Sequence, residues 1–481
     1  MSFVQVEFFA FFAVVLILNW FLKRWPLIWR LFLLFSSYFF YSIWNIYFLL
    51  MLFLTSLFNF LSGLAISKNF FGARKPIFIF SVIANLSVLG FFKYYDFFRV
   101  SAEVFLTKIG LPPTLPFLQI VLPIGLSFYI FRTISYNADV YLGKISPTSS
   151  VLDFLIYVAF FPQLLSGPIA RAGDFLVQLK DGGAKKINDL YGNFTLIFLG
   201  LFKKLVISSY LVVNITDDVF AVPENYSSLV ILLSVFAYSL VIYFDFSGYT
   251  DLAIGFAGLM GFRSPINFDV PYLSLNIQDF WRRWHITLSS WIRDYVYIPL
   301  GGSQKGLMRK YFNLMTAMIL VGLWHGAATH FIIWGGLHGM ALVGYHLYQD
   351  RKKVNFSSKV ILKPAKKLRK TISNLFCWFI TFNFVSFAWI FFRLETTENA
   401  FKFIKTLFVS PKSIEAFQVY IFYVVIIGFL FFLFEKEIVR YLTIFQEKLP
   451  IILWFCFAIL IIILIFKLSP EVIPTFIYFG F

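Results

Sequence analysis

Long apolar runs separated by short polar stretches extend over most of the chain, and this pattern predicts helices that cross a lipid bilayer. A helical crossing needs about 20 mainly apolar residues. Clear runs occur at 3–22, 27–44, 45–66, 77–98, 117–135, 190–213, 226–246, 372–393, 417–434 and 451–469. Runs that are shorter or broken by Gly and Pro occur at 151–166, 311–324 and 331–348. We therefore expect roughly eleven to thirteen crossings.

The region between residues 136 and 310 departs from this pattern, because Gly and Pro recur there at membrane depth. They are Gly167, Pro168, Gly248, Gly255, Gly258, Gly261, Pro265, Pro271, Pro299, Gly301 and Gly302. Irregular backbone inside a bilayer is tolerated only where protein buries it or where it lines a water-filled cavity. We expect re-entrant or in-plane helices around a central cavity in this region.

One segment, 281–297, has the spacing of an amphipathic helix. Its apolar residues recur every three or four positions and form one stripe, which consists of Trp281, Trp284, Leu288, Trp291 and Tyr295. Arg282, Arg283 and Arg293 lie on the other side. Two interpretations stay open: an interfacial helix anchored at headgroups, or a helix that lines a cavity and offers arginines to phosphate groups.

The composition excludes a soluble globular protein. Of 481 residues, 60% are hydrophobic and 14% are charged, whereas a soluble domain is about 45–50% apolar and about 25% charged. The net charge of +17 does not indicate nucleic acid binding, because the basic residues lie between apolar runs, where cytoplasmic loops collect Lys and Arg. The sequence predicts an all-α polytopic membrane protein whose surroundings are a lipid bilayer.

The strongest topology signal is the segment 351–370, which holds nine Lys or Arg and no acidic residue. We expect a cytoplasmic loop there and an N-terminus on the opposite side. The whole chain then forms one integral-membrane domain in four parts. These are N-terminal helices (1–120), a core (121–348), a basic cytoplasmic loop (349–371) and C-terminal helices (372–481).

His325 is the first candidate for chemistry. It follows Gly322 in a presumed spanning segment and precedes Gly326. An ionisable residue at that depth is a functional candidate, and imidazole suits general base work near neutral pH. The flanking glycines would let another backbone or a substrate approach closely. The alternative is a core histidine bonded to a carbonyl group.

The remaining polar candidates are Asp245, Asp251 and three further histidines. Asp245 could orient a histidine or pair with Arg282 or Arg283, whereas Asp251 could simply cap a helix that begins near Thr250. His330 and His338 follow His325 at spacings that do not fit a zinc site, so we expect no metal. His346 is expected at headgroup level.

At these residues the sequence resembles the membrane-bound O-acyltransferase family, and in particular its bacterial alginate O-acetylation branch. The matching stretches are 122–129, 161–169, 244–251, 280–289, 297–302 and 322–326. The stretch from Trp334 to Gly339 resembles this branch more than the teichoic acid D-alanylation branch, and adds His338 as a possible supporting residue. Ala328, Thr329 and His330 depart from the family pattern, which leaves the role of His330 open.

The resemblance implies a ring of helices around a tunnel, in a multi-pass protein of the bacterial inner membrane. It implies His325 as the general base and His285 at the family's second polar position. His285, Asn276 or backbone amides would stabilise the oxyanion. No bound cofactor is implied; acetyl-CoA or another acyl thioester is the donor substrate. The acceptor is an extracytoplasmic polysaccharide. The acyl group passes to it with the help of an extracytoplasmic partner protein, which is an acyl relay or an acetyltransferase.

Two other functions remain open. The first is transfer of D-alanine from a carrier protein to teichoic acid. The second is a channel or transporter, because a helical bundle with charges near the bilayer midplane also fits that role.

Overall fold

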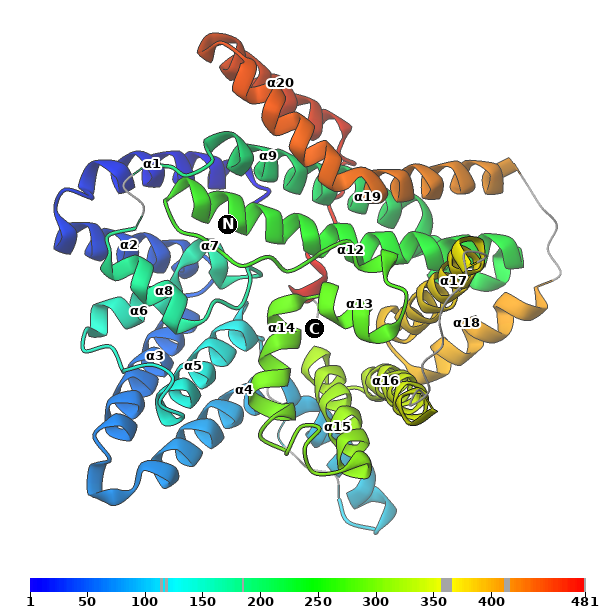
Figure 1. Ribbon diagram of the computed structural model, residues 1–481, viewed down its shortest axis with the longest axis horizontal. Coiled ribbons are helices and arrows are strands. Elements are labelled where there is room, and N and C mark those ends of the chain that lie inside the picture. The colour runs from blue at the N-terminus through cyan, green and yellow to red at the C-terminus, as the bar shows by residue number, and fades with distance from the viewer. Residues whose placement is uncertain (113–115, 117–119, 184–185, 356–365, 411–415, 480–481) are drawn as a thin grey trace. The chain divides into compact units, whose positions relative to one another are not determined.

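The structure, a computed structural model, describes the chain except for residues 113–115, 117–119, 184–185, 356–365, 411–415 and 480–481. Every regular element within the described ranges is a helix (Figure 1), and they contain no strand. The expected all-α class is confirmed. Most of the basic segment 351–370 falls on or beside the undescribed residues, so its predicted cytoplasmic location stays a prediction.

The chain divides into two compact units, each described here by itself. The first unit comprises Met1–Leu201, Gly248–Pro265 and Tyr441–Ile462, and the second comprises Phe202–Ser247, Ile266–Arg440 and Ile463–Phe481. The helices up to the first boundary are α1 (Val6–Leu22), α2 (Pro26–Ser42), α3 (Ile46–Ser67), η1 (Phe70–Gly72), α4 (Arg74–Lys108), α5 (Leu126–Tyr141), α6 (Val151–Ala159), α7 (Phe161–Leu164), α8 (Ala172–Lys180) and α9 (Leu190–Leu201).

The helix of α9 continues into the second unit through two π-helical stretches. The elements from there to the middle of the chain are η2 (Phe202–Ser208), α10 (Ser209–Leu211), η3 (Val212–Thr216), α11 (Asp217–Ala221), η4 (Pro223–Asn225), α12 (Ser228–Leu259), η5 (Pro271–Leu273), α13 (Ile277–Arg283), α14 (Ile286–Ile292) and η6 (Arg293–Tyr297). They are followed by α15 (Leu307–His325), α16 (Thr329–Asn355), α17 (Lys366–Arg393), α18 (Thr397–Val409), α19 (Ala416–Lys448), α20 (Ile451–Leu468) and η7 (Ile477–Phe479).

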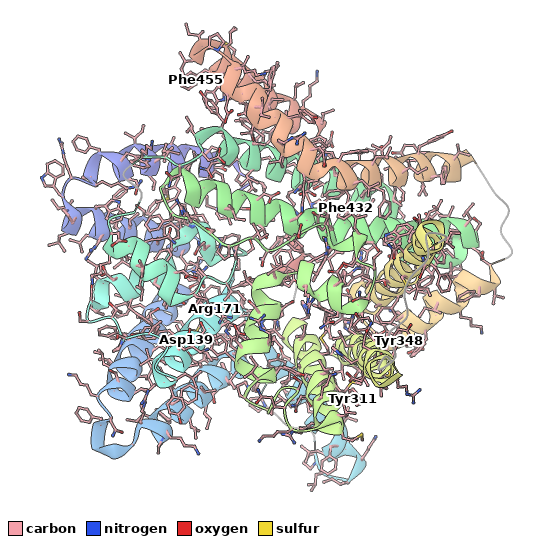
Figure 2. All side chains as sticks on the ribbon, viewed as in Figure 1. Asp139, Arg171, Tyr311, Tyr348, Phe432 and Phe455 are labelled. Carbon is pink, nitrogen blue, oxygen red and sulfur yellow. The ribbon has the colours of Figure 1, made fainter. Side chains whose placement is uncertain are left out.

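Seven stretches of described helix are long and apolar enough to cross a membrane. They are Ile46–Ser67, Arg74–Lys108, Leu190–Ala221, Ser228–Leu259, Thr371–Arg393, Val419–Lys448 and Ile451–Leu468, and the shorter apolar helix Val6–Leu22 adds to them. Large apolar side chains such as Phe455 on α20 (Figure 2) are more than half exposed, as lipid-facing residues are. The chain is thus a multi-pass membrane protein, whereas the higher total expected from the sequence stays a prediction.

The glycines of α12 do not interrupt the helix. Irregular backbone at these glycines and a helix that begins near Thr250 were both expected from the sequence, and both expectations are wrong. The helix runs unbroken from Ser228 to Leu259, so Asp251 lies inside it and cannot be an N-cap. In the first unit these glycines bring α9 and α12 together instead. A Cβ on Gly255 would lie 2.8 Å from the carbonyl oxygen of Asn193, and one on Gly200 would lie 2.7 Å from the carbonyl oxygen of Gly248.

Irregular backbone does occur elsewhere in the region where it was expected, between α12 and α13 and again after η6. The loop after η6 is fixed by Asn313, whose amide donates to the carbonyl of Gly302 at 3.0 Å. The expected helix over 117–135 begins only at Leu126, because Gly125 at φ +76° packs tightly and a Cβ there would lie 2.6 Å from the carbonyl oxygen of Leu164.

Candidate active site

The hairpin of α15 and α16 places His325 at its turn. Glycines let the two helices approach: a Cβ on Gly335 would lie 3.2 Å from the Cα of Ile319, and one on Gly322 would lie 3.3 Å from the Cα of Gly335. Gly326 ends α15 in an extended conformation directly after His325. Gly322 thus shows the expected close approach of another backbone, whereas a Cβ on Gly326 would meet the ring of Phe331.

His325 is 3% exposed and lies among aromatic rings. Its ring centroid is 4.8 Å from those of Trp324 and Phe392. The rings of Trp334 and Tyr478 lie at 5.1 Å and 5.5 Å. An imidazole in such surroundings is shielded from bulk water.

His285 lies at a break in the chain, which corrects the expected continuous helix over 281–297. The residue has φ +41°, a left-handed conformation that is uncommon outside glycine, and it separates α13 from α14. Asn267 stabilises the break: its Oδ1 accepts from the backbone N–H of Thr287 at 3.2 Å and from the Thr287 hydroxyl at 2.7 Å. The His285 Nδ1 lies 3.3 Å from the same oxygen.

The two histidines share aromatic neighbours. The ring of His285 is 6.0 Å from that of Trp324 and 6.3 Å from that of Tyr478, both of which also contact His325. Phe246 completes the group, with its ring 4.7 Å from that of His285 and 4.6 Å from that of Tyr478. We call these five residues the histidine site, and all five belong to the second unit.

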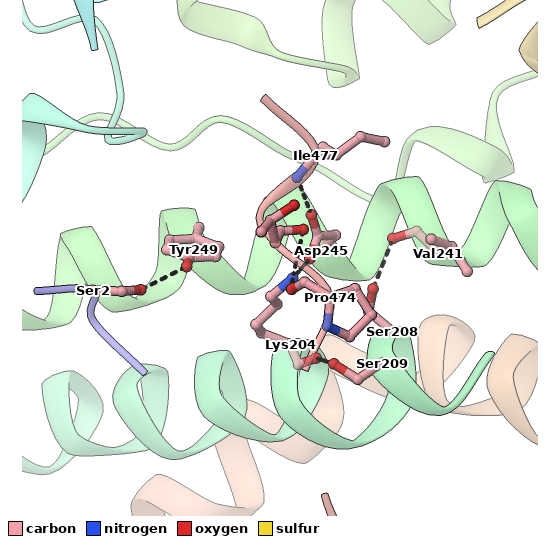
Figure 3. A network of polar contacts seen from close by, with 10 residues as sticks. Ser2, Lys204, Ser208, Ser209, Val241, Asp245, Tyr249, Pro474 and Ile477 are labelled. Atoms are coloured by element: carbon pink, nitrogen blue, oxygen red, sulfur yellow. Dashed lines mark hydrogen bonds and ion pairs between the residues drawn. The ribbon is translucent and has the colours of Figure 1, made fainter. Parts of the chain in front are cut away.

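Tyr478 reaches this site because polar contacts bind the segment that follows α20 (Figure 3). Asp245 accepts a hydrogen bond from the backbone N–H of Ile477 at 2.8 Å and also pairs with the ammonium group of Lys204. Lys204 donates in turn to the carbonyl oxygen of Pro474 at 2.9 Å. Asp245 thus pairs with Lys204, whereas Arg282 and Arg283 were the partners considered from the sequence.

A cavity of about 670 Å³ lies in the second unit beside α13, α14, α15 and α16. Its lining residues include Trp281, Arg282, Arg293, Lys310, Leu314, Ala317, Val321, Leu342, Tyr345, His346 and Asp350. The ammonium group of Lys310 lies 2.7 Å from Asp350 Oδ2, and this hydrogen bond lowers the pKa of the Asp350 carboxyl. Tyr311, labelled in Figure 2, donates to the same oxygen at 3.1 Å. We call this space the α15 cavity.

The α15 cavity follows one face of α15 toward His325. Its lining residues Lys310, Leu314, Ala317 and Val321 recur every three or four positions, which places them on one side of the helix. His325 is the next residue of that series. Trp281 lines the cavity as well, and its ring is 5.8 Å from that of Trp334, a neighbour of His325.

The arginines expected to bind the donor separate into two groups. Arg282 and Arg293 line the α15 cavity, and both are exposed. Arg283 is directed elsewhere: its Nε lies 3.1 Å from Asp279 Oδ1 and its guanidinium donates to the carbonyl of Asp269 at 3.4 Å. Arg293 also forms an ion pair, with Asp294 at 2.8 Å.

The remaining candidates have identifiable local roles. Asn276 is the N-cap of α13 and accepts from the backbone N–H of Asp279 at 2.8 Å. His338 is fully buried, and its ring is 4.8 Å from Trp334 and 5.2 Å from Trp281. His330 lies with its Nδ1 2.7 Å from the carbonyl oxygen of Phe391, a contact typical of a structural histidine. No group of metal-ligating side chains occurs within the described ranges.

A second, smaller pocket of about 250 Å³ lies past the end of α17. It is lined by Asp217, Phe220, Ala221, Pro223, Arg393, Leu394, Glu395, Asn399, Lys402 and Phe403. Arg393 forms an ion pair with Asp217 at 2.7 Å and directly follows Phe392, whose ring contacts His325. We call this the Arg393 pocket.

Sequence reasoning missed Tyr478 and Lys204. Tyr478 lies in a short aromatic segment with no periodicity, so no pattern connected it with the histidines. Lys204 does carry a local signal, because an ionisable residue within an apolar run is a functional candidate.

Comparison with known proteins agrees with this architecture. The model of the membrane-bound O-acyltransferase family matches residues 34–352. A peptidoglycan O-acetyltransferase of Helicobacter pylori is 37% identical over 435 residues, which cover 84% of this chain and 77% of that protein. A probable alginate O-acetylase of Pseudomonas aeruginosa is 39% identical over 381 residues, covering 79% and 69% of the two chains. A teichoic acid D-alanyltransferase of Bacillus subtilis is 30% identical over 285 residues, covering 56% and 68%.

The α15 cavity ends at Val321, one helical turn before the buried His325. The chain belongs to the membrane-bound O-acyltransferase family. It is an O-acyltransferase, as the resemblance in its motifs predicted.

Proposed function

We propose that this enzyme transfers an acetyl group from a cytoplasmic thioester to hydroxyl groups of a polysaccharide outside the cytoplasm. His325 is the general base in this reaction, and the enzyme resides in the bacterial inner membrane. The polysaccharide is an alginate-like exopolymer or a cell-wall glycan, the two acceptors that the names of the relatives contain. Transfer of acetyl is favoured over D-alanyl because the O-acetylating relatives match more of the chain.

The observation that carries the proposal is the alignment of the α15 cavity with His325 along one face of α15. The cavity runs from Lys310 past Leu314 and Ala317 to Val321, and His325 follows Val321 by one helical turn on the same face. We propose that the substrate arm follows this face to the imidazole. Such a path supports a reaction at His325 between a donor from one side of the membrane and an acceptor from the other.

The chemistry at His325 follows from its position. The imidazole takes the proton of the attacking hydroxyl while the hydroxyl oxygen bonds to the thioester carbonyl carbon. The carbon–sulfur bond then breaks, and the proton passes from the imidazolium to the departing thiolate. General base assistance of this kind contributes about 10²–10⁴-fold to the rate. We assign support of the oxyanion to His285, whose ring shares the neighbours Trp324 and Tyr478 with His325.

The charges of the α15 cavity support an acyl donor that carries phosphate. Arg282, Arg293 and Lys310 line the cavity against one carboxylate, Asp350. Guanidinium groups bind phosphate oxygens in pairs. Acetyl-CoA has this chemistry, and its pantetheine arm is a narrow chain whose length suits a path along the face of α15. The role proposed from the sequence is therefore assigned to Arg282 and Arg293, and not to Arg283.

The acceptor side is assigned to the Arg393 pocket, which holds both donors and acceptors of hydrogen bonds. Arg393, Asn399 and Lys402 donate, whereas Asp217 and Glu395 accept. We assign completion of the transfer to an extracytoplasmic partner protein that receives or positions the acyl group. The basic segment 351–370 precedes α17 and the Arg393 pocket follows it, so a crossing by α17 separates the two sides.

Reconstitution tests this function directly. The purified protein in vesicles is supplied with radiolabelled acetyl-CoA or with D-alanine on a carrier protein, and with polysaccharide on the other side, with and without the partner. Acetyl transfer that requires the partner is expected. If only D-alanine is transferred, the donor is the D-alanyl carrier protein and not acetyl-CoA. Ion conductance without any acyl transfer would instead support a channel, and efficient acetylation without a partner would refute the relay alone.

A further inference from the structure

We propose that Lys204 and Asp245 are positioning residues that hold the segment 474–478 against the histidine site. This inference rests on the proposed function, because it concerns how the site at His325 is closed. Neither residue contacts the reacting atoms in this account. Both act through the backbone that they bind.

Three contacts attach the segment. The Ile477 N–H donates to Asp245 at 2.8 Å, and the Lys204 ammonium donates to the carbonyls of Pro474 at 2.9 Å and Thr475 at 3.4 Å. The ion pair between Lys204 and Asp245 joins the two attachment points (Figure 3). The side chains of Lys204 and Asp245 are 2% and 4% exposed. An ion pair buried so deeply is costly to desolvate and offers little net stability, so its polar backbone partners help to account for it.

The π-helical stretch η2 explains why Lys204 faces this segment. Lys203 and Lys204 are adjacent and both buried, although neighbouring residues of an α-helix point about 100° apart. The wider π-helical turn, which is frequent at functional sites, lets each reach its own carboxylate. Lys203 pairs with Glu435, whose other oxygen accepts from the Tyr243 hydroxyl at 2.6 Å. Lys203 is therefore a matched control: another buried lysine in the same turn, directed to a different partner.

The attached segment forms part of the histidine site. Tyr478 follows the bonded Ile477, and its ring lies 5.5 Å from that of His325. Phe476 precedes it, is 1% exposed, and packs on Phe246 at 5.8 Å between ring centroids. Phe246 in turn follows Asp245 in α12. Release of the segment would remove an aromatic side of the site and admit water to the thioester.

Hydrogen exchange in the full-length protein tests the attachment independently of activity. Peptides that cover 474–478 are followed by mass spectrometry in wild type, Lys204→Met and Lys203→Met. We expect exchange of the Ile477 amide to accelerate about tenfold in Lys204→Met, because its acceptor loses the ion pair that orients it. Lys203→Met should leave this peptide at the wild-type rate. Equal exchange in wild type and Lys204→Met would refute the attachment.

A double variant guards against loss of folding. Lys204→Met leaves Asp245 buried without its cation, whereas Lys204→Met/Asp245→Leu removes both charges and is the better tolerated change. We expect the double variant to remain folded by size-exclusion chromatography and to show the same fast exchange. If the double variant is folded and its segment stays protected, apolar packing alone holds the segment and the proposal fails.

The consequence for the reaction is measured as the ratio of donor hydrolysis to acetyl transfer. We expect this ratio to rise several-fold in Lys204→Met and to stay unchanged in Lys203→Met. Deletion of 474–481 should produce the same rise, and Lys204→Met should add nothing to it, since both act on one segment. Fast exchange with an unchanged ratio would refute the role in closing the site. If wild type transfers no acyl group at all, the proposed function fails while the exchange result still decides the attachment.

Discussion

The contact between α9 and α12 and the contact between α15 and α16 both use glycine to bring two helices together, but they differ in what lies beside the glycines. In the first, Gly200 and Gly255 admit the backbone of the facing helix and the side chain of Ile197. In the second, Gly322 and Gly335 do the same, and the hairpin ends in His325. Close approach itself is thus a packing device that serves both regions.

The difference between these regions identifies which signal points to function. Small residues at helix contacts in membranes allow van der Waals packing where lipid supplies no hydrophobic driving force. They occur wherever helices must pack closely. A buried ionisable side chain at the same place is costly and needs a further reason. Buried ionisable residues also lie close in sequence to the α9–α12 glycines, at Lys204 and Asp245, but these two form an ion pair with each other. His325 is instead surrounded by aromatic rings, and this difference distinguishes α15–α16 from α9–α12.

The largest effect is expected from His325→Ala. If His325 is the general base, acetyl transfer should fall about 10²–10⁴-fold, since that is the contribution of a positioned base. Asn193→Ala is the control from the other helix contact and should leave the rate per folded molecule near wild type. Transfer by proteoliposomes is compared at equal amounts of folded protein. A His325→Ala enzyme within a few-fold of wild type would end the assignment.

His285→Asn should reduce transfer about 10²-fold, the scale of losing one oxyanion partner. Asparagine is chosen because it tolerates the left-handed backbone found at this residue. The change therefore removes the imidazole while keeping the break between α13 and α14. His346→Asn, at the rim of the α15 cavity, provides a comparison for imidazole loss away from the histidine site. Equal activity of both variants would show that His285 only shapes the loop.

The fold class could be predicted from the sequence, because long apolar runs are local signals. The Gly-flanked histidine in such a run is local as well, and the role of His325 stays a prediction. The break at His285 could not be predicted, since it depends on Asn267, eighteen positions earlier, accepting from Thr287. The continuity of α12 was also missed. Glycine lowers helix propensity locally, and only the facing backbone of α9 shows that Gly248 and Gly255 serve packing.

Gly335→Ala and Gly255→Ala compare the two helix contacts directly. Each added methyl meets facing backbone, at Met318 and Ile319 for Gly335 and at Asn193 for Gly255. Overpacking costs about 1–3 kcal/mol, partly offset by the better helix propensity of alanine. Both variants should melt earlier by a similar amount in detergent.

Activity should separate these two variants. Displacement of α15 in Gly335→Ala moves His325, and a misplacement near 1 Å can cost about 10²-fold in rate. Gly255→Ala should retain transfer per folded molecule. Equal losses in both would mean that the α15–α16 contact has no special link to the reaction.

A smaller effect is expected from Arg282→Gln and Arg293→Gln. Each removes a cation that lines the α15 cavity, and a charged hydrogen bond contributes about 1.5–3 kcal/mol, reduced here by solvent exposure. The KM for acetyl-CoA should rise by about tenfold or less, with kcat little changed. Arg283→Gln is the matched control because Arg283 pairs with Asp279. If the variants are stable and bind the donor as tightly as wild type, these arginines anchor the helix at lipid headgroups and do not bind donor phosphate.

The smallest effect is expected from His330→Ala, although this histidine is only five residues from His325. Its Nδ1 lies 2.7 Å from the carbonyl oxygen of Phe391 at the end of α17, so it links α16 to α17 and does not line the α15 cavity. Loss of one such hydrogen bond costs about 0.5–1.5 kcal/mol of stability. Transfer at saturating acetyl-CoA should stay within a few-fold of wild type, while the melting temperature falls slightly. His330→Gln should recover part of that stability, because its amide can donate to the same carbonyl. A loss as large as that of His325→Ala in a folded protein would show that His330 takes part in the reaction. The Arg393 pocket beside it would then need a different functional assignment.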